Sequence, residues 1–377
     1  MAATYDVIVI GLGAMGSAAA YQLARRGKRV LGLERFTAAH ANGSSTGRSR
    51  IIRQAYMEDP AYVPLLLRAY ELWEQIERET GETLLTLTGG LMLGAPDSQA
   101  VAGATRSAEE HGLEYELLDA AEVRRRFPAL QPDDGTCALY ERRAGFLRPE
   151  ASIAAHLRRA AELGAELRFE EPADAWEADE RGVRVRTARG SYEAERLVNA
   201  PGAWAPQLLD LELPLQVLRQ VLVWFDPEGG TEPFLPDRFP IYIWETPRAT
   251  FYGFPHQEGP PGGVKVALHG GGEPCTPETI DRNVRPDDIE ELRAVIGERI
   301  PALRGPVLHA QTCMYTMTPD EHFVLGMHPH RPNVVVASPC SGHGFKFASV
   351  VGEILADLAE TGATRHPIGL FDPTRFA

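Results

Sequence analysis

The sequence predicts a mixed α/β (α+β) fold, in which one discontinuous domain of βαβ units is interrupted by an inserted, β-rich domain. Two observations support this prediction. Strand, glycine-rich turn and helix patterns follow one another at both ends of the 377-residue chain, and short strand patterns dominate its middle. We assign residues 1–85, 145–215 and 310–377 to the discontinuous domain, and residues 86–144 and 216–309 to the inserted one.

The first βαβ unit covers residues 5–34. Residues 5–10 form a β-rich run, residues 17–26 have helical composition, and Gly27 suits the position just after a helix. Residues 29–33 form a second strand that ends at Glu34. Two strands joined through a helix in this way lie parallel to each other.

The rest of the chain alternates between helical and strand-like segments. Helices are expected over residues 61–80, 150–163 and 345–360, where Gly81 and Gly164 stop the first two. The proline- and glycine-rich residues 227–240 are expected to form a loop. Strands are expected near residues 84–93, 183–187, 196–199, 251–254, 264–268 and 333–337.

Composition excludes several classes of protein. The net charge of −14 argues against nucleic acid as the main partner, because a polyanion needs a basic face. No segment reaches the roughly 18 consecutive apolar residues of a membrane span, so no membrane partner is expected. The cysteines are widely separated, which predicts neither a disulfide framework nor a zinc site and favours a reducing, cytoplasmic location. These four cysteines are Cys137, Cys275, Cys313 and Cys340.

Gly11, Gly13 and Gly16 form the pattern GxGxxG between the first strand and its helix. The first glycine permits a tight turn, the second lets the backbone approach a pyrophosphate, and the third lets helix and strand pack closely. Glu34 follows the second strand, where a carboxylate accepts hydrogen bonds from ribose hydroxyls. This context predicts a bound dinucleotide; the alternative is a purely structural glycine turn.

Two later segments favour FAD over NAD as this dinucleotide. Residues 197–204 run from a strand into a turn of small residues, and residues 338–346 run from a strand into the start of a helix. In FAD enzymes of the disulfide-reductase and amino-acid-oxidase type, such later turns also contact the cofactor. A helix that begins near Gly344 could stabilise negative charge on the flavin pyrimidine oxygen, although ordinary loop glycines would give the same pattern.

Lysine is rare in this chain, which makes each lysine informative. The 38 basic residues include only three lysines, Lys28, Lys265 and Lys346. If most exposed lysines have been replaced by arginine, the remaining lysines are expected at positions that need a compact ammonium group. The alternative is that they are surface lysines retained by chance. Arg50 and Arg53 lie three residues apart and could grip a carboxylate, or could be ordinary surface arginines.

Cysteine and histidine patterns alone predict little chemistry. A lone cysteine such as Cys313 is most often a small buried hydrophobe. The pair His328 and His330 is too closely spaced and lacks a third ligand nearby, so no metal is expected.

Taken together, the motifs resemble those of the monomeric sarcosine oxidases and their relatives, the N-methyltryptophan and pipecolate oxidases. These enzymes form the amine-oxidising branch of the D-amino-acid-oxidase-like flavoproteins. The resemblance spans essentially the whole chain and implies a Rossmann-like FAD-binding domain with an inserted substrate-binding domain. It rests on the glycine motif with Glu34-Arg35 and on residues 49–56, 263–269, 312–322 and 341–347.

The resemblance implies roles for individual residues. Cys313 matches the cysteine that binds FAD covalently, through its sulfur, at the flavin 8α-methyl group. Arg53 and Lys346 match the pair that holds the substrate carboxylate. Lys265 matches a lysine near flavin N5 that promotes reaction with O₂, and Arg50 matches an arginine at the flavin face. Tyr252, His269, Tyr315 and His343 match residues that line the active site. Further cofactor contacts are expected from Gly11, Gly13, Gly16, Glu34, Arg35, Ser44, Gly342 and Gly344.

One loop departs from the family pattern. Thr46 and Arg48 stand where the family has a His-Gly pair followed by a polar residue. This loop is expected to lie near the flavin, so the departure bears on redox tuning.

The implied activity is FAD-dependent oxidation of a secondary amino acid, sarcosine or a similar N-alkylglycine, by O₂ and water. The products are glycine, an aldehyde and H₂O₂, and the family suggests a monomer. Arg53 and Lys346, with no carboxylate nearby, would also favour the neutral amine, because positive charge lowers an ammonium pKa. The alternatives are an N-methyltryptophan, pipecolate or other amino-acid oxidase, an FAD dehydrogenase that does not use O₂, an NAD-dependent dehydrogenase, and a flavin-carrying binding protein.

Overall fold

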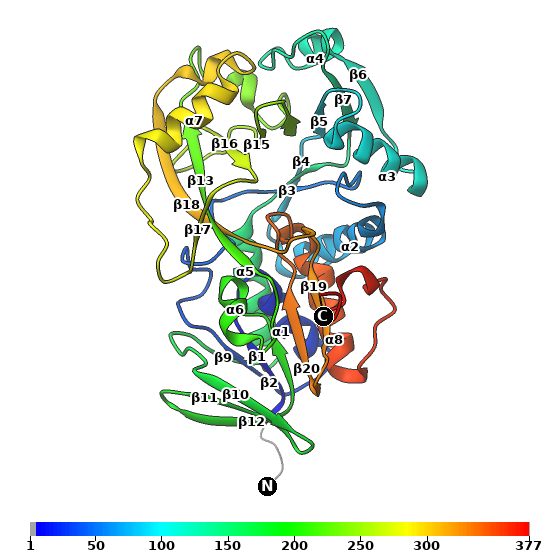
Figure 1. The fold of residues 1–377 in the computed structure, drawn as a ribbon, viewed down its shortest axis with the longest axis vertical. Helices are drawn as coiled ribbons and strands as arrows, with labels where there is room; N and C mark the ends of the chain where they lie inside the picture. The colour runs from blue at the N-terminus through cyan, green and yellow to red at the C-terminus, as the bar shows by residue number, and fades with distance from the viewer. Residues whose placement is uncertain (1–4, 377) are drawn as a thin grey trace.

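The computed structural model describes residues 5–376, and its two largest sheets lie one above the other along the long axis of the molecule (Figure 1). The lower sheet has eight strands, and four of them run parallel at its centre in the order β2-β1-β12-β20. These central strands are β1 (Tyr5–Ile10), β2 (Val30–Leu33), β12 (Gly190–Asn199) and β20 (Arg331–Ser338). The remaining strands are β9 (Glu166–Arg168), β10 (Ala175–Asp179), β11 (Gly182–Thr187) and β19 (Val324–His328).

Helices from distant parts of the chain cover the lower sheet. They are α1 (Ala14–Arg25), α2 (Val63–Thr80), α5 (Pro149–Glu162) and α8 (Ala348–Thr361). α1 contacts both α5 and α8, and its alanines Ala18, Ala19 and Ala20 are fully buried. A β-carbon on Gly352 of α8 would lie 2.6 Å from the Ala18 carbonyl carbon, so this glycine permits the close approach of α1 and α8.

The upper sheet has nine strands and is largely antiparallel. Its strands are β5 (Gly90–Gly94), β6 (Glu116–Asp119), β7 (Cys137–Glu141), β13 (Gln216–Phe225), β14 (Ile241–Glu245), β15 (Thr250–Gly253), β16 (Val264–His269), β17 (Glu273–Cys275) and β18 (Val307–Met317). Outer helices are α3 (Ala104–His111), α4 (Ala120–Arg126) and α7 (Pro286–Ile296), and a short α6 (Ala205–Leu208) follows β12. A small third sheet contains β3 (Arg50–Ile52), β4 (Leu85–Leu87) and β8 (Gly145–Leu147).

Strand β13 has the most partners in the upper sheet, since it pairs with β16, β17 and β18. It pairs antiparallel with β16 on one side and β18 on the other. Lys265 of β16 lies opposite Trp224, and Cys313 of β18 lies opposite Gln220. Two residues from distant parts of the sequence are therefore fixed on the two strands that flank β13.

The predicted mixed α/β class and the first βαβ unit are confirmed. The predicted helices at 61–80 and 345–360 each begin with a 3₁₀ turn, at Pro60–Tyr62 and at Phe345–Phe347, before the α-helix starts. Helices α3, α4 and α7 were not predicted. The division into two domains stays a prediction, and β18 runs across its boundary at residue 310.

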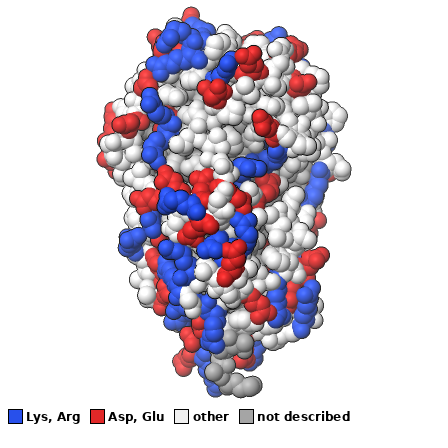
Figure 2. All heavy atoms as spheres, turned by 180° about the vertical axis from the view of Figure 1, so that it is seen from behind, with Lys and Arg blue, Asp and Glu red and all other residues white. Residues whose placement is uncertain are grey.

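Acidic and basic side chains are interspersed over the face shown in Figure 2, where no continuous basic field forms. Within residues 5–376, no helix combines the length and apolar character needed to cross a membrane.

Candidate functional site

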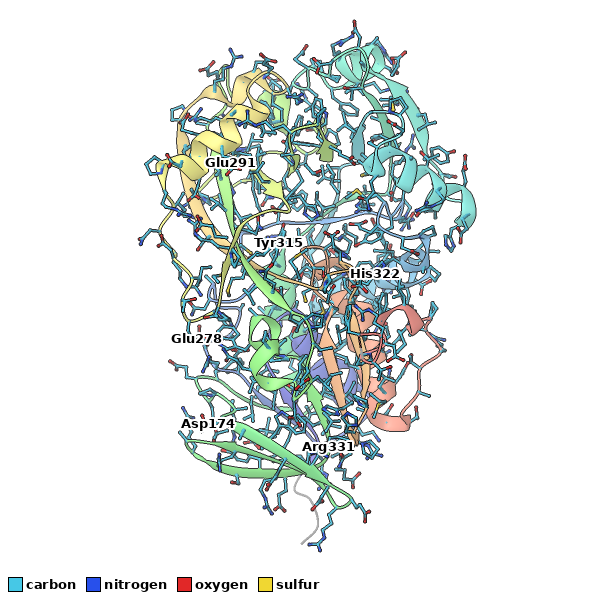
Figure 3. All side chains as sticks on the ribbon, viewed as in Figure 1. Asp174, Glu278, Glu291, Tyr315, His322 and Arg331 are labelled. Carbon is cyan, nitrogen blue, oxygen red and sulfur yellow. The ribbon has the colours of Figure 1, made fainter. Side chains whose placement is uncertain are left out.

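A cavity of about 430 Å³ opens between the lower sheet and the upper sheet. Its wall includes most of the residues that the sequence predicted for a site. These are Gly11, Gly13, Glu34, Arg35, Ser44, Arg50, Arg53, Tyr252, His269, Tyr315, Gly342, His343, Gly344 and Lys346. Gly16, Lys265 and Cys313 lie behind this wall. Figure 3 marks Tyr315, which lies where the two parts of the molecule meet.

The glycine turn after β1 has the shape that a bound dinucleotide requires. Gly11 has a φ of +81°, and a β-carbon there would collide with the carbonyl of Ala200. A β-carbon on Gly16 would collide with the carbonyl of Gly11, whereas Gly13 has no atom within 4 Å of that position. The first and third glycines thus allow close packing, and the second leaves open space beside the backbone for a phosphate group.

Glu34 directly follows β2 and lies next to this turn. Its carboxylate accepts hydrogen bonds from the backbone N–H groups of Leu12, at 2.8 Å, and Phe36, at 3.1 Å. The neighbouring Arg35 is exposed, and its guanidinium lies 5.3 Å from the ring centre of Trp204. These side chains suit the ribose and adenine end of a dinucleotide.

Ser44 and Arg50 line the cavity, and Cys313 contacts both of them. The guanidinium of Arg50 donates to the Ser44 carbonyl at 2.9 Å, and one of its nitrogens lies 3.5 Å from Cys313 Sγ. Cys313 is 2% exposed.

Lys265 is buried behind the loop that contains residues 44–49. Its ammonium donates to the carbonyls of Gly47, at 2.8 Å, and Ser49, at 2.9 Å, and to the Ser49 hydroxyl at 3.3 Å. Burial, together with the positive charge of Arg50, lowers the pKa of Lys265 well below its usual range.

Glu150, in the first turn of α5, holds the same loop from the opposite side. Its carboxylate accepts from the backbone N–H groups of Gly47 and Arg48, at 2.8 and 3.2 Å, and from the Thr46 hydroxyl at 3.3 Å. The Arg48 guanidinium in turn donates to the carbonyls of Glu258 and Gly259. Thr46 and Arg48, which depart from the family pattern, therefore both have definite partners.

Arg53 and Lys346 line one end of the cavity, but a carboxylate accompanies them. Glu58 accepts from Arg53 Nη2 with both oxygens, at 2.7 and 2.8 Å. Although burial raises the pKa of Glu58, the Arg53 charge holds it at about 2, so Glu58 is ionised. The expectation of a purely cationic pocket was wrong, because the loop after β3 brings this acidic residue into the wall.

Tyr56 contacts both cations. The Arg53 guanidinium lies 4.2 Å and the Lys346 ammonium 5.2 Å from the centre of its ring, and Lys346 donates to its hydroxyl at 3.4 Å. The hydroxyl also lies 2.6 Å from His343 Nδ1, and His343 Nε2 lies 3.0 Å from the carbonyl of Glu321. Because Nε2 faces an acceptor, we assign the proton to Nε2, and Tyr56 donates to Nδ1.

Titratable groups around this end of the cavity are shifted by burial. Burial lowers the pKa of Lys346 to about 7, with a further contribution from the charge of Arg53. Burial also lowers the pKa of His343 to about 3 and lowers that of His269. A cluster of shifted groups in one cavity is typical of an active site.

Tyr252, Tyr315 and His269 form an aromatic group on the upper-sheet side. The two phenol oxygens lie 3.4 Å apart, and the His269 ring centre is 6.1 Å from Tyr252 and 5.9 Å from Tyr315. Burial raises the pKa of both phenols, so both stay neutral. This part of the wall is aromatic, with the two phenol hydroxyls and the His269 imidazole as its polar groups.

The turn before α8 closes the cavity. Gly342 has a φ of +79°, and a β-carbon there would lie 2.6 Å from the Tyr315 ring. A β-carbon on Gly344 would collide with the carbonyl of Pro339. The 3₁₀ turn Phe345–Phe347 and α8 begin directly after these glycines, as the sequence predicted, so unpaired N–H groups are available at this end.

Glu58, Glu150 and Tyr56 were not identified as site residues from the sequence. Glu58 and Glu150 belong to no motif, since single acidic residues are common in a chain with 52 of them. Tyr56 ends the segment 49–56, and its place there was the one available signal. Within residues 5–376, no three His, Cys, Asp or Glu side chains group as metal ligands would.

The whole chain matches known flavoproteins. Residues 6–358 match the family model described as DAO, FAD dependent oxidoreductase. A monomeric sarcosine oxidase of Streptomyces avermitilis is 58% identical over 100% of this chain and 99% of its own length. One from Bacillus sp. (strain B-0618) is 40% identical over 100% and 97%, and an N-methyl-L-tryptophan oxidase of Salmonella agona is 36% identical over 94% of each chain.

Solved structures agree with this assignment. NikD, an unusual amino acid oxidase essential for nikkomycin biosynthesis, superposes with a TM-score of 0.85 at 27% identity, covering 98% of this chain and 97% of its own. An L-proline dehydrogenase from P. horikoshii gives 0.85 at 26% identity, covering 100% and 98%. The glycine turn, Glu34 and the cavity between the two sheets fit the dinucleotide that such enzymes use. The chain belongs to the DAO family of FAD-dependent oxidoreductases.

Proposed function

We propose that this enzyme oxidises a secondary amino acid, sarcosine or a similar N-alkylglycine, with O₂ and water, to give glycine, an aldehyde and H₂O₂. The observation that carries the proposal is the buried pair Arg53 and Lys346 at one end of the cavity. These two cations are 1% and 5% exposed, and Glu58 supplies only one negative charge for both of them, so a substrate carboxylate would supply the second. The names of the relatives at 58% and 40% identity support the same substrate class.

Arg53 and Lys346 would orient the substrate by its carboxylate. Arg53 Nε is buried and has no partner within residues 5–376, and two of the three N–H groups of Lys346 are used there. A carboxylate that binds Arg53 Nη2 has to displace Glu58 from it. Fixing one end of a small substrate in this way orients its amine end relative to the aromatic group of Tyr252 and Tyr315.

The residues around the glycine turn would hold FAD. Gly13 leaves space for the pyrophosphate, Glu34 would accept from the ribose, and the start of α8 would face the flavin end. The chemistry that bound FAD supplies is acceptance of two electrons from the carbon next to the amine nitrogen and their transfer to O₂. Within this arrangement, Arg50 would stabilise negative charge and the aromatic group would exclude water.

We infer that Cys313 binds FAD covalently. Its thiol is buried and contacts Arg50 and the Ser44 carbonyl, two groups of residues that line the cavity. In Cys313→Ala we expect acid precipitation to release the yellow colour into the supernatant, whereas the wild type keeps it in the pellet. Colour that stays in the pellet of the variant would move the link to Cys340, which lines the cavity.

We infer that Lys265 promotes the reaction with O₂. A buried ammonium stabilises the negative charge that develops on O₂, and one such group is typically worth about a hundred- to thousandfold in rate. Lys265→Met is therefore expected to keep the rate of anaerobic reduction by substrate and to lose most of the rate of reaction with O₂. Equal losses in both half-reactions would overturn this role.

The deciding experiment is a substrate panel in an oxygen electrode. We expect O₂ uptake and H₂O₂ release with sarcosine above those with L-proline, pipecolate and N-methyl-L-tryptophan. Faster turnover of a bulkier compound would identify that compound, and not sarcosine, as the preferred substrate. Reduction of the enzyme without O₂ uptake would identify it as a dehydrogenase.

We also propose that the enzyme acts as a monomer in the cytoplasm. The names of the relatives support the monomer, and four free cysteines suit a reducing compartment. Light scattering of the purified protein tests the first point, with 41.3 kDa expected.

A further inference from the structure

One peptide group joins Lys265 to Glu150. The carbonyl of Gly47 accepts from the Lys265 ammonium at 2.8 Å, and the N–H of Arg48, in the same peptide unit, donates to both Glu150 oxygens at 3.2 Å. The C=O and N–H of a trans peptide point in opposite directions. The ammonium and the carboxylate therefore lie at the two ends of one peptide dipole, each next to the end of opposite partial charge.

Further bonds fix this arrangement on both sides. The Gly47 N–H and the Thr46 hydroxyl also donate to Glu150, and Ser49 offers its carbonyl and its hydroxyl to Lys265. The Gly47 carbonyl and the two Ser49 oxygens together use all three N–H groups of the Lys265 ammonium. Gly47 has a φ of +93°, and a β-carbon there would lie 2.6 Å from Leu222 and 3.4 Å from Lys265 Nζ, so a side chain at this position would disturb the contact.

The charges around Lys265 come from three other elements. Arg50 of β3 opposes the ammonium, whereas Cys313 of β18 and Glu150 of α5 favour it. The remaining neighbours are the rings of Trp224 and Phe254, at 5.4 and 4.6 Å from Nζ to the ring centres. Glu150 is thus the one carboxylate in this group. The Cys313 thiol would be lost from the group if it formed the proposed covalent link to FAD.

We propose that Glu150 is a positioning residue that supplies, through the Gly47–Arg48 peptide, the counter-charge that holds the Lys265 ammonium beside Arg50. This inference rests on the proposed function, in which Lys265 promotes the reaction with O₂. Hydrogen bonds in series polarise one another, so loss of charge at Glu150 weakens the acceptor at Gly47. Glu150→Gln removes the charge and retains one acceptor oxygen, which can take the place of Oε1 and accept from Thr46, Gly47 and Arg48, while an NH₂ group replaces Oε2.

The small number of lysines makes the test direct. Holoenzyme labelled with ¹³Cε-lysine has three lysine signals, from Lys28, Lys265 and Lys346. The signal missing from Lys265→Met identifies Lys265. In Glu150→Gln we expect the pKa of Lys265 to fall by about one further unit, as loss of a nearby opposite charge predicts. In Glu150→Asp, which keeps the charge but withdraws it by one CH₂ group, we expect a smaller fall.

Glu141→Gln is the matched control. Glu141 is buried, whereas Glu150 is half-buried, and like Glu150 it accepts two backbone N–H groups, those of Gln54 and Ala55, but it is not among the charges that act on Lys265. Its replacement should leave the Lys265 titration unchanged. A Lys265 pKa that is the same in Glu150→Gln, Glu150→Asp and wild type would overturn the proposal.

The half-reactions separate this inference from the proposed function. Where the pH exceeds the Lys265 pKa, a one-unit fall predicts reaction with O₂ about tenfold slower in Glu150→Gln, with substrate reduction unchanged. If Lys265→Met reacts with O₂ as fast as wild type, the proposed role of Lys265 fails. If Lys265→Met is slow but Glu150→Gln is not, the role of Glu150 fails. Equal slowing of both half-reactions in Glu150→Gln would make Glu150 a structural residue only.

Discussion

At the scale of single residues, the two cations proposed to hold the substrate differ in how they titrate. Arg53 keeps its charge at every physiological pH. Burial lowers the pKa of Lys346 to about 7, from a usual value of 10.5. His343, with a pKa of about 3, and Glu58, at about 2, do not change charge near neutrality. The affinity of the pocket for a carboxylate should therefore follow the protonation of Lys346.

We expect the dissociation constant of acetate, a minimal carboxylate, to rise about tenfold per pH unit above about pH 7. The reason is that neutral Lys346 no longer attracts an anion. Flavin absorbance of the holoenzyme at increasing acetate concentration measures this constant. Lys346→Met should bind acetate weakly and without this pH dependence. A constant in wild type that stays flat across this range would show that Lys346 is already charged throughout.

Functional residues could be predicted from the sequence where their residue type is rare in the chain. Lys265 and Lys346 stand out because the chain retains so few lysines. Glu58 and Glu150 have no such compositional signal, because acidic residues are common in the chain. Their roles depend on contacts that the fold creates, with Arg53 and with the loop at Gly47. The pairing of Glu150 with Gly47 spans 103 positions, and no local pattern encodes it.

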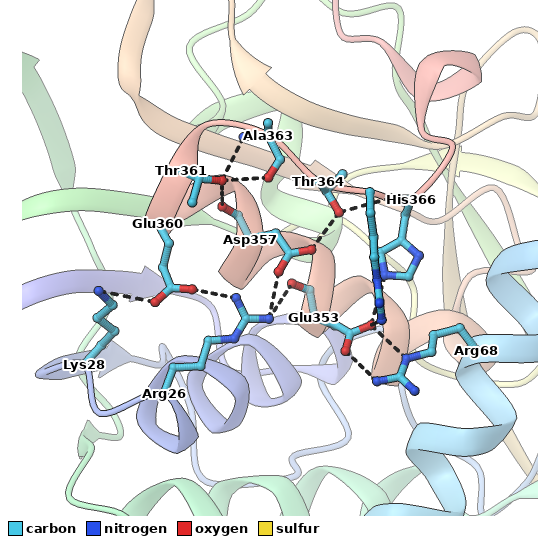
Figure 4. A network of polar contacts seen from close by, with 11 residues as sticks. Arg26, Lys28, Arg68, Glu353, Asp357, Glu360, Thr361, Ala363, Thr364 and His366 are labelled. Atoms are coloured by element: carbon cyan, nitrogen blue, oxygen red, sulfur yellow. Dashed lines mark hydrogen bonds and ion pairs between the residues drawn. The ribbon is translucent and has the colours of Figure 1, made fainter.

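At the scale of elements, α8 is held to α1 and α2 by ion pairs around its buried face (Figure 4). Glu353 accepts from Arg68 at 2.7 and 2.9 Å and lies 2.9 Å from His366 Nε2. Although burial raises the pKa of Glu353, these hydrogen bonds lower it well below its usual value of 4.5. Because the folded-state pKa lies below the unfolded one, this stabilisation is present above about pH 4.5 and is lost as pH falls below it.

We expect Glu353→Gln to reduce the free energy of unfolding at pH 7 by about 1–3 kcal/mol, because Arg68 loses a charged partner in a partly buried site. Urea unfolding followed by circular dichroism measures the change. The difference from wild type should shrink as pH falls below 4.5. Glu71→Gln, which removes an exposed partner of the same Arg68, should cost at most about 1 kcal/mol. Equal losses in the two variants would contradict this account.

Elements were predictable where a local stop signal accompanies the pattern. Gly81 and Gly164 stop the predicted helices at 80 and 163, and α2 and α5 end at Thr80 and Glu162. The order of the nine-stranded sheet was not predictable, because β5 pairs in parallel with β14, about 150 positions later, across unrelated segments. Helix α7 has only 11 residues and lies outside the nucleotide-type motifs that guided the prediction.

At the scale of the whole molecule, the cavity draws its wall from both large sheets. Gly11, Gly13 and Glu34 follow strands β1 and β2 of the lower sheet, and Tyr252, His269 and Tyr315 belong to strands of the upper one. A cofactor that binds in this cavity therefore contacts both parts of the chain and stabilises their arrangement. Any ligand that binds only the folded state raises the free energy of unfolding by mass action.

This coupling predicts a large effect of FAD on the stability of Cys313→Ala, in which the cofactor is expected to exchange. At an FAD concentration of about a hundred times its dissociation constant, binding adds about 2.7 kcal/mol. That corresponds to a rise in Tm of about 3 °C in a chain of this size. Scanning calorimetry of the stripped variant with and without FAD measures it. Because the wall spans both sheets, the stripped protein should also show faster hydrogen exchange in β16 and β18 as well as near the glycine turn. Faster exchange confined to the glycine turn would mean that the upper sheet is stable without the cofactor, and that FAD does not join the two parts of the molecule.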